Sequence, residues 1–299
     1  MSRSTSIAVW LRVAVAALAV AVSATCARAQ SWLEGGRVLD AGTLFMWNGQ
    51  TEPGGPPGFD EPLASDRPDF TEASSTVGRG VVQLEMGYTF FHNDDATAHT
   101  QSHSYPELLA RIGMLADWFE FRVAWNHATE NDFFNPVTRT VSGGEDLYLG
   151  AKLMLTSQYG IWPEMSLMPQ MTVPTGHSEF TAGKVLPGVN WLYGWDLLEW
   201  LSFAGSTQGN LAVDDVGDDY FEFAQSFTFG YSLAERLGAY TEWFMLTPAG
   251  SIAARTQHYL DGGFTYSVTN NLQLDIRAGL GLSDASDDYF VGSGLVVRF

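Results

Sequence analysis

Isolated acids and arginines alternate with apolar residues in several stretches of the chain. In residues 82–90, for example, Glu85 falls on the face opposite Leu84 and Met86. Eight charges share this kind of spacing: Glu85, Arg111, Glu120, Arg122, Asp261, Asp275, Arg277 and Arg298. Four carboxylates and four guanidinium groups that face one another can form ion pairs, whereas an unpaired charge out of water costs several kcal/mol. The pattern therefore predicts an interlocked charged belt rather than a strongly charged filter. A wet lumen, in which each charge is hydrated separately, is the alternative.

Covalent and metal chemistry have no motif in this sequence. The chain lacks G-x-S-x-G, H-E-x-x-H and a glycine-rich phosphate loop, so we expect no catalytic residue, no cofactor and no enzyme activity. Acidic stretches at residues 92–95, 214–219 and 284–288 offer carboxylate oxygens of the kind that Ca²⁺ prefers. None has the spacing of an EF-hand, so solvated loops are the favoured interpretation and the sequence predicts no metal site.

The elements that must position these charges are β-strands. Successive side chains of a strand point to opposite faces, and apolar residues alternate with small or polar ones in twelve stretches of residues 80–299. The last stretch, Tyr289 to Phe299, ends in an aromatic residue. Links between stretches alternate between brief and longer polar ones, and the polar residues 92–103 and those up to about residue 143 are expected to be loops. An even strand number with such links favours a closed transmembrane barrel over a secreted β-sandwich.

Composition and the N-terminus agree with export to an outer membrane. Residues 1–29 contain Arg3 and Arg12, an apolar run and the end Ala-Arg-Ala, which is typical of a cleaved signal peptide. The one cysteine, Cys26, lies within this peptide, so no disulfide is expected. The full chain has a formal net charge of −19, and removal of the peptide with its three arginines leaves 12 − 34 = −22. This charge argues against nucleic acid as a partner.

The segment before the strands has a different character. Residues 30–79 are rich in Pro and Gly around residues 53–58 and then carry the dense charges of residues 64–72. We expect this segment to lie at the periplasmic mouth or in the lumen of the barrel, with a free tail as the alternative. The predicted organisation is therefore a signal peptide (1–29), an N-terminal segment (30–79) and a barrel (80–299).

Two stretches carry a resemblance to a known family. They are Asp66-Arg67-Pro68-Asp69-Phe70-Thr71-Glu72 with the following Gly80-x-x-Gln83-Leu84-Glu85-x-Gly87-Tyr88, and, later, Asp261-x-Gly263 with Asn271-Leu272-Gln273-Leu274-Asp275. The chain resembles the transporter-like outer-membrane family named for the meta-cleavage (MetA) pathway of phenol degradation. The resemblance covers most of the mature chain, is weak between about residues 185 and 260, and marks Asp66, Arg67, Pro68 and Asp69 as family-motif residues. It implies an outer-membrane barrel that passes small, aromatic or apolar compounds.

The expected fold class is thus all-β, a twelve-stranded antiparallel transmembrane barrel in the outer membrane of a Gram-negative-type bacterium. The expected function is a porin-like channel or transporter for small molecules. A structural or surface-display barrel is the alternative, followed by a lipid-facing hydrolase for which His127 is the candidate base. Expected partners are outer-membrane lipid and lipopolysaccharide, the barrel assembly machinery through the C-terminal strand, and a small-molecule cargo.

Specific neighbours within the belt can also be predicted, from the face on which each residue lies and from its distance to the nearest turn. Arg111 is expected across from Arg122 with Glu120 nearby. Arg277 is expected opposite Asp261, and Arg298 is expected diagonal to Asp275 and close to Glu85. We expect this belt to form the constriction of the lumen.

Overall fold

The computed structural model describes residues 42–47, 59, 61–94, 99–134, 137–214, 216–251 and 253–299. The predicted signal peptide and most of the segment up to residue 60 lie outside these residues. A short 3-10 helix, η1 (Leu44–Met46), precedes the strands. The strands are β1 (Val82–Asp94), β2 (His99–Gly113), β3 (Phe119–Phe134), β4 (Val137–Gly144), β5 (Leu147–Thr156), β6 (Glu164–Val173), β7 (Leu186–Leu198), β8 (Leu201–Val213), β9 (Asp219–Ala234), β10 (Leu237–Ala249), β11 (Gln257–Thr269), β12 (Leu272–Gly281) and β13 (Tyr289–Arg298).

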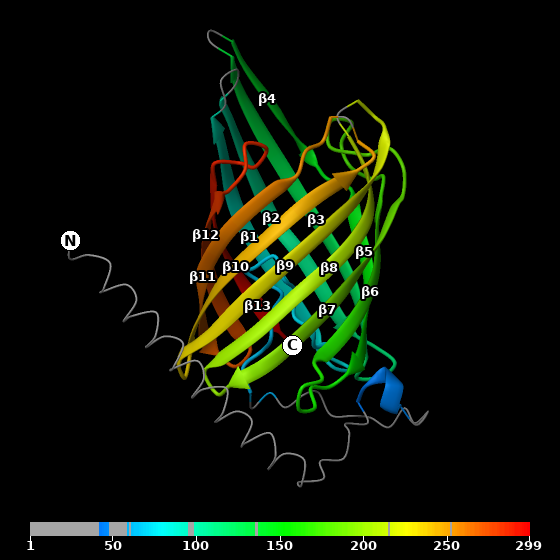
Figure 1. The fold of residues 1–299 in the computed structure, drawn as a ribbon, viewed down its shortest axis with the longest axis vertical. Coiled ribbons are helices and arrows are strands. Elements are labelled where there is room, and N and C mark those ends of the chain that lie inside the picture. The colour runs from blue at the N-terminus through cyan, green and yellow to red at the C-terminus, as the bar shows by residue number, and fades with distance from the viewer. Residues whose placement is uncertain are drawn as a thin grey trace, which may run out of the picture.

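All strands belong to one antiparallel sheet that closes on itself. Each strand from β5 to β13 pairs with the next along the chain, β13 pairs with β1, and β2 pairs with both β1 and β3. The strand β4 pairs only with the upper half of β3, and β5 pairs with the lower half, so β4 and β5 occupy one position in the wall. The wall therefore has twelve positions, which confirms the predicted barrel (Figure 1).

Side chains alternate across the wall as a transmembrane barrel requires. On β12, Leu274, Ile276 and Leu280 are 46%, 57% and 58% exposed on the outer face, while Gln273 and Asp275 are buried on the inner face. Apolar side chains can remain exposed on a barrel only where lipid replaces water around them. The outer surface is accordingly a lipid-facing band. Among the described residues, no helix is long and apolar enough to span a membrane.

The links between strands define two different ends of the barrel. Residues 199–200, 235–236 and 270–271 form tight turns at one end, whereas residues 174–185 and 282–288 form longer loops at the other. Short turns mark the periplasmic end and long loops the extracellular end. Two polar stretches expected to be loops are strands instead. The strands β1 and β2 extend to Asp94 and from His99, and β3 and β4 form a hairpin that projects beyond the rim, because their backbone groups pair with each other even where no apolar alternation exists (Figure 1).

The chain before β1 does not join the wall. Residues 61–81, which we call the insert, enter from the periplasmic end, where Leu63 N donates to Asn270 O at 2.9 Å. The insert then runs through the interior and meets the wall again at Val82, whose backbone N and O both bond to Phe299. The first and last strands are thereby closed at the same point where the insert ends.

Candidate functional site: the charged lumen and its insert

Asp66 is the centre of a buried charge cluster in the lumen. Its carboxylate accepts from Arg122 Nη1 at 2.5 Å and from Lys152 Nζ at 3.2 Å, and it lies 3.3 Å from Arg111 Nη1. Its backbone N–H donates to both oxygens of Glu85 at 3.2 Å. The insert is thus held at one residue by wall strands β1, β2, β3 and β5.

The electrostatics of this cluster favour the ionised form of Asp66. Burial by itself opposes ionisation, but attraction to Arg111, Arg122 and Lys152 outweighs it and holds the pKa of Asp66 well below its ordinary value. Glu120 supports the same cations, since Arg111 Nε and Arg122 Nη1 both donate to its Oε1 at 2.9 Å. The described side chains of Arg111, Arg122 and Lys152 are 0% exposed, so protein fills the lumen at this level.

Arg67 reaches from the insert to the opposite side of the barrel. Its guanidinium donates to Glu107 Oε2 at 2.7 Å and to the two oxygens of Asp275 at 3.2 and 3.3 Å. It also occupies space that two wall glycines leave open. A Cβ added to Gly87 or Gly294, which pair across β1 and β13, would lie 2.3 Å from the Arg67 side chain. The absence of a side chain at these glycines therefore leaves the space that the Arg67 guanidinium occupies.

The next turn of the insert is bound by Glu242 on β10. The backbone N–H groups of Phe70 and Thr71 donate to its two oxygens at 2.6 and 2.8 Å. Thr71 Oγ1 also bonds to Glu242 and, on β9, to Ser226. Because a carboxylate that accepts several donors binds them strongly, this contact anchors the insert to the wall side away from Asp66.

The rest of the insert follows strands β2 to β6. Lys152 Nζ donates to Ala73 O at 2.7 Å, and Val77 N donates to Glu120 Oε2 at 2.9 Å. Ser74 Oγ donates to Glu164 Oε1 at 2.7 Å. Side chains of the wall therefore form hydrogen bonds with backbone groups of the insert. A buried segment without regular secondary structure needs such partners for its N–H and C=O groups.

The eight predicted belt residues all lie on strands of the barrel, but the structure divides them. Arg111 pairs with Arg122 across β2 and β3, with Glu120 bonded to both, in the predicted arrangement. Glu85 joins this group through Arg111 Nη1 at 3.2 Å. The group is one compact cluster, and Asp66 of the insert lies at its centre.

The predicted partners of Arg277 and Arg298 are wrong. Gly263, and not Asp261, lies opposite Arg277, whose Nη1 and Nη2 donate to Pro68 O at 2.9 Å and Thr89 Oγ1 at 2.7 Å. Arg298 donates to Asn271 Oδ1 at 2.9 Å and to Glu61 O at 2.8 Å at the periplasmic end. The strand register places glycines on both sides of Arg277. The insert then supplies further acceptors, Pro68 O for Arg277 and Glu61 O for Arg298.

Asp261 and Asp69 belong to a separate acidic region. Asp261 Oδ2 accepts from Tyr240 OH at 2.7 Å, while its buried Oδ1 has no hydrogen-bond partner among the described residues. Asp69 of the insert is placed near it and near Glu242. Burial and repulsion from Glu242 raise the pKa of Asp69 well above its ordinary value. Asp69, Glu242 and Asp261 thus form an acidic region that is separate from the Asp66 cluster.

Several residues of the site were absent from the predicted belt. They are Lys152, Glu242 and Glu107 on the wall and Glu72 on the insert. The alternation of side chains along their strands predicts that Lys152, Glu242 and Glu107 face the lumen, so the sequence pattern was enough to identify these three. Glu72, whose carboxylate accepts from Arg122 Nη2 at 2.7 Å, lies in the motif stretch but has no strand parity.

Aromatic side chains line the lumen on the extracellular side of the insert. Phe244, Tyr259 and Phe290 form a buried cluster against which Phe70 and Phe91 pack. The Phe70 ring of the insert stacks on Phe244 with centroids 4.6 Å apart and planes at 3°. We call these five residues the aromatic cluster. It is a buried apolar cluster inside an otherwise charged lumen, directly next to the Glu242 anchor.

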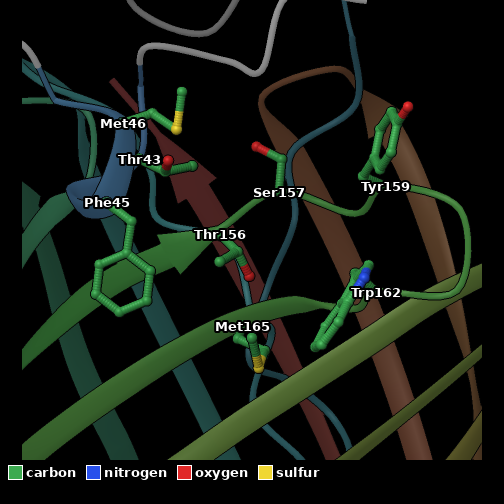
Figure 2. Close-up of a pocket in the computed structure, with 8 residues that line it drawn as sticks. All are labelled: Thr43, Phe45, Met46, Thr156, Ser157, Tyr159, Trp162 and Met165. Atoms are coloured by element: carbon green, nitrogen blue, oxygen red, sulfur yellow. The ribbon is translucent and has the colours of Figure 1, made fainter.

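An apolar pocket lies outside the barrel, at its periplasmic end. It has a volume of about 190 Å³ and is lined by residues of η1 and of the turn between β5 and β6, among them Phe45, Met46, Thr156, Trp162 and Met165 (Figure 2). The Trp162 side chain is 67% exposed. Since Met165 alternates with Glu164 and Ser166, which face the insert, this pocket faces the membrane interface and is not part of the lumen.

Comparisons with known proteins agree with this architecture. An outer membrane channel from Pseudomonas putida F1 superposes with a TM-score of 0.57 at 12% sequence identity, over 76% of this chain and 98% of that one. The translocator domain of the autotransporter NalP from Neisseria meningitidis gives a TM-score of 0.47 at 9% identity, over 73% of this chain and 88% of that one. The likeness to the Pseudomonas putida channel, at this low identity, shows a shared barrel fold only. No curated protein matches the chain.

One family model matches residues 65–299, and its description reads "MetA-pathway of phenol degradation". The match begins at Ser65, immediately before the four motif residues of the insert. It therefore includes most of the lumen-filling segment together with the whole wall.

Proposed function

Because the chain belongs to the family described as the MetA pathway of phenol degradation, we propose that it is an outer-membrane channel for small molecules that carry an aromatic or apolar group. Outer-membrane location follows from the closed barrel with its lipid-facing band. The cargo class is the part that requires support from the site.

The aromatic cluster carries this proposal. A solute that opens this buried cluster from the extracellular end would lie among aromatic rings, which offer few hydrogen bonds. An aromatic solute would gain ring contacts there, each worth about 0.5 to 1.5 kcal/mol beyond the buried area. A cluster of this kind inside the lumen favours apolar rings over sugars and ions.

Passage also requires the insert to move. The chain fills the lumen at the level of Asp66, where the surrounding cations are inaccessible to water. Phe70 belongs both to the aromatic cluster and to the segment that Glu242 holds. A cargo that displaces Phe70 from Phe244 would therefore act directly on the contact that anchors the insert.

Uptake into proteoliposomes tests the proposal. We expect a labelled phenol-sized aromatic compound to enter faster than a sugar of equal mass, and Phe244→Ala to reduce only the aromatic uptake. Phe227→Ala is the matched control, because Phe227 is 40% exposed on the lipid side of the neighbouring strand β9. Equal uptake of both solutes, or equal effects of the two variants, would contradict an aromatic cargo.

The two alternative functions have weaker support. His127 Nε2 lies 2.9 Å from Ser142 Oγ on the projecting hairpin, but no described residue orients the other ring nitrogen of His127 as a hydrolase would need. A purely structural barrel would not require an aromatic cluster in its lumen. We further propose that β13, which ends at Phe299, is the segment that the assembly machinery binds, so deletion of Phe299 is expected to lower the amount of folded protein in the membrane.

A further inference from the structure

A cluster of imidazole and carboxylate groups lies outside the lumen, at the extracellular end of the β1 and β2 hairpin. It consists of His92 and Asp94 at the end of β1 and His99 at the start of β2, where Asp94 and His99 are paired across the two strands. One nitrogen or oxygen from each of the three side chains lies within 4.8 Å of the others. The channel function proposed above does not use these residues.

The separations approach those of ligands that share one ion. His99 Nδ1 is 3.8 Å from Asp94 Oδ1. Two ligands of a tetrahedral zinc ion, each at about 2.1 Å from the metal, are about 3.4 Å apart. The His92 and His99 rings meet edge to face with centroids 4.7 Å apart. Asp94 and His99 are the more exposed side chains, so their rotation toward His92 can bring the three donors together.

His92 supplies an independent sign of a missing ligand. Its Nδ1 is buried, and no described residue forms a hydrogen bond with it. A buried polar atom without a partner is energetically unfavourable, so such atoms are uncommon. The ring cannot easily turn away, because it is stacked on Tyr289 with centroids 4.8 Å apart. A metal ion would satisfy this nitrogen.

The surrounding groups are those that support metal ligands. Gln101 Nε2 lies 3.1 Å from His99 Nε2, so the amide oxygen, after a flip of the amide, can accept from that nitrogen and leave Nδ1 free toward Asp94. Asp288 Oδ2 accepts from Asp94 N at 2.8 Å and adds negative charge close to the cluster. Both contacts fix the backbone or ring of a ligand without competing for its donor atom.

We propose that His92, Asp94 and His99 form a binding site for a divalent transition-metal ion of the zinc type. Two imidazoles with one carboxylate select such ions over Ca²⁺ and Mg²⁺, which prefer oxygen ligands alone. Three protein ligands leave the fourth tetrahedral position for water. The bound ion would join the two strands across their turn and so stabilise the extracellular tip of the hairpin.

Calorimetric titration of the folded, tag-free protein with ZnCl₂ tests the site. We expect one ion per chain, with the affinity lowered by about tenfold or more in His99→Gln, because a direct ligand is lost. His103→Gln is the matched control, since His103 lies on the same strand and face but is bonded to Tyr88 OH at 2.8 Å. It should bind Zn²⁺ as the parent does. Absence of saturable binding at submillimolar ZnCl₂, or equal losses in both variants, would overturn the proposal.

Two further measurements separate ligation from a change of fold. Heat-modifiable migration on gels should show that His99→Gln is as folded as the parent. Co²⁺ should give the intense visible absorption of a tetrahedral site in the parent and in His103→Gln but not in His99→Gln. Displacement of Co²⁺ by Ca²⁺ at equal concentration would show a carboxylate-only site and would likewise reject the proposal.

Discussion

Replacement of Asp66 by Asn separates the insert from the wall with the smallest change of shape. The substitution keeps the side-chain volume but removes the charge that accepts from Arg122 at 2.5 Å and Lys152 at 3.2 Å and that lies 3.3 Å from Arg111. Loss of one member of a buried charge cluster costs about 3 to 5 kcal/mol, because the remaining charges stay out of water. Glu120 compensates part of the remaining charge, so we expect a value near the lower limit.

The cost should appear as undocking of the insert and not as unfolding of the barrel. The hydrogen bonds between the strands of the wall do not involve Asp66. The backbone amides of Phe70, Thr71 and Val77, in contrast, donate to side chains of the wall, and these bonds protect them from hydrogen exchange. Their hydrogen exchange measures the free energy of local opening. A loss of about 3 kcal/mol corresponds to exchange that is faster by about a hundredfold or more.

Asp219→Asn is the matched control for this experiment. Asp219 accepts from Lys184 at 2.5 Å, but the two side chains are 63% and 41% exposed. An exposed pair contributes at most about 1 kcal/mol, and this one lies far from the insert in the chain. If Asp66→Asn leaves exchange of the insert amides as slow as Asp219→Asn does, the buried cluster does not hold the insert.

Three further outcomes are expected. Gly87→Ala should displace the Arg67 guanidinium, which lies 2.3 Å from the added Cβ, and should raise single-channel conductance in planar bilayers, whereas an unchanged conductance would mean that Arg67 does not help close the lumen. The low pKa of Asp66 stabilises the folded state above the ordinary pKa of about 4 and loses this effect as the pH falls toward the lowered value, so insert protection followed from neutral to about pH 3 should fall in the parent but change less in Asp66→Asn. Arg298→Ala should increase exchange at Leu63 alone, because Arg298 contacts Glu61 O and leaves the Asp66 cluster untouched; faster exchange at Thr71 would show that the two regions are coupled.

The wall of this barrel can be derived from the pattern of the amino-acid sequence. A strand has a side-chain period of two, so the alternation around Glu85 or Leu274 places each residue inside or outside without knowledge of its neighbours. The even strand number and the short and long links follow from the same pattern. The alternation fails at residues 99–104 and 137–144, which are mostly polar on both faces, so the sequence predicts loops where the structure has strands.

The filling of the lumen, by contrast, depends on long-range contacts that the sequence pattern does not reveal. The alternation along its strand predicts that Arg277 points inward. Its hydrogen-bond partner, however, depends on the path of the insert, which has no periodic pattern. Pro68 and Asp66 lie far from Arg277 and Lys152 in the chain, and their contacts arise because the insert folds back through a closed sheet. A local pattern cannot encode such a path, since it is set by the joint fit of many charges, the space over Gly87 and Gly294, and the closure of β1 on β13.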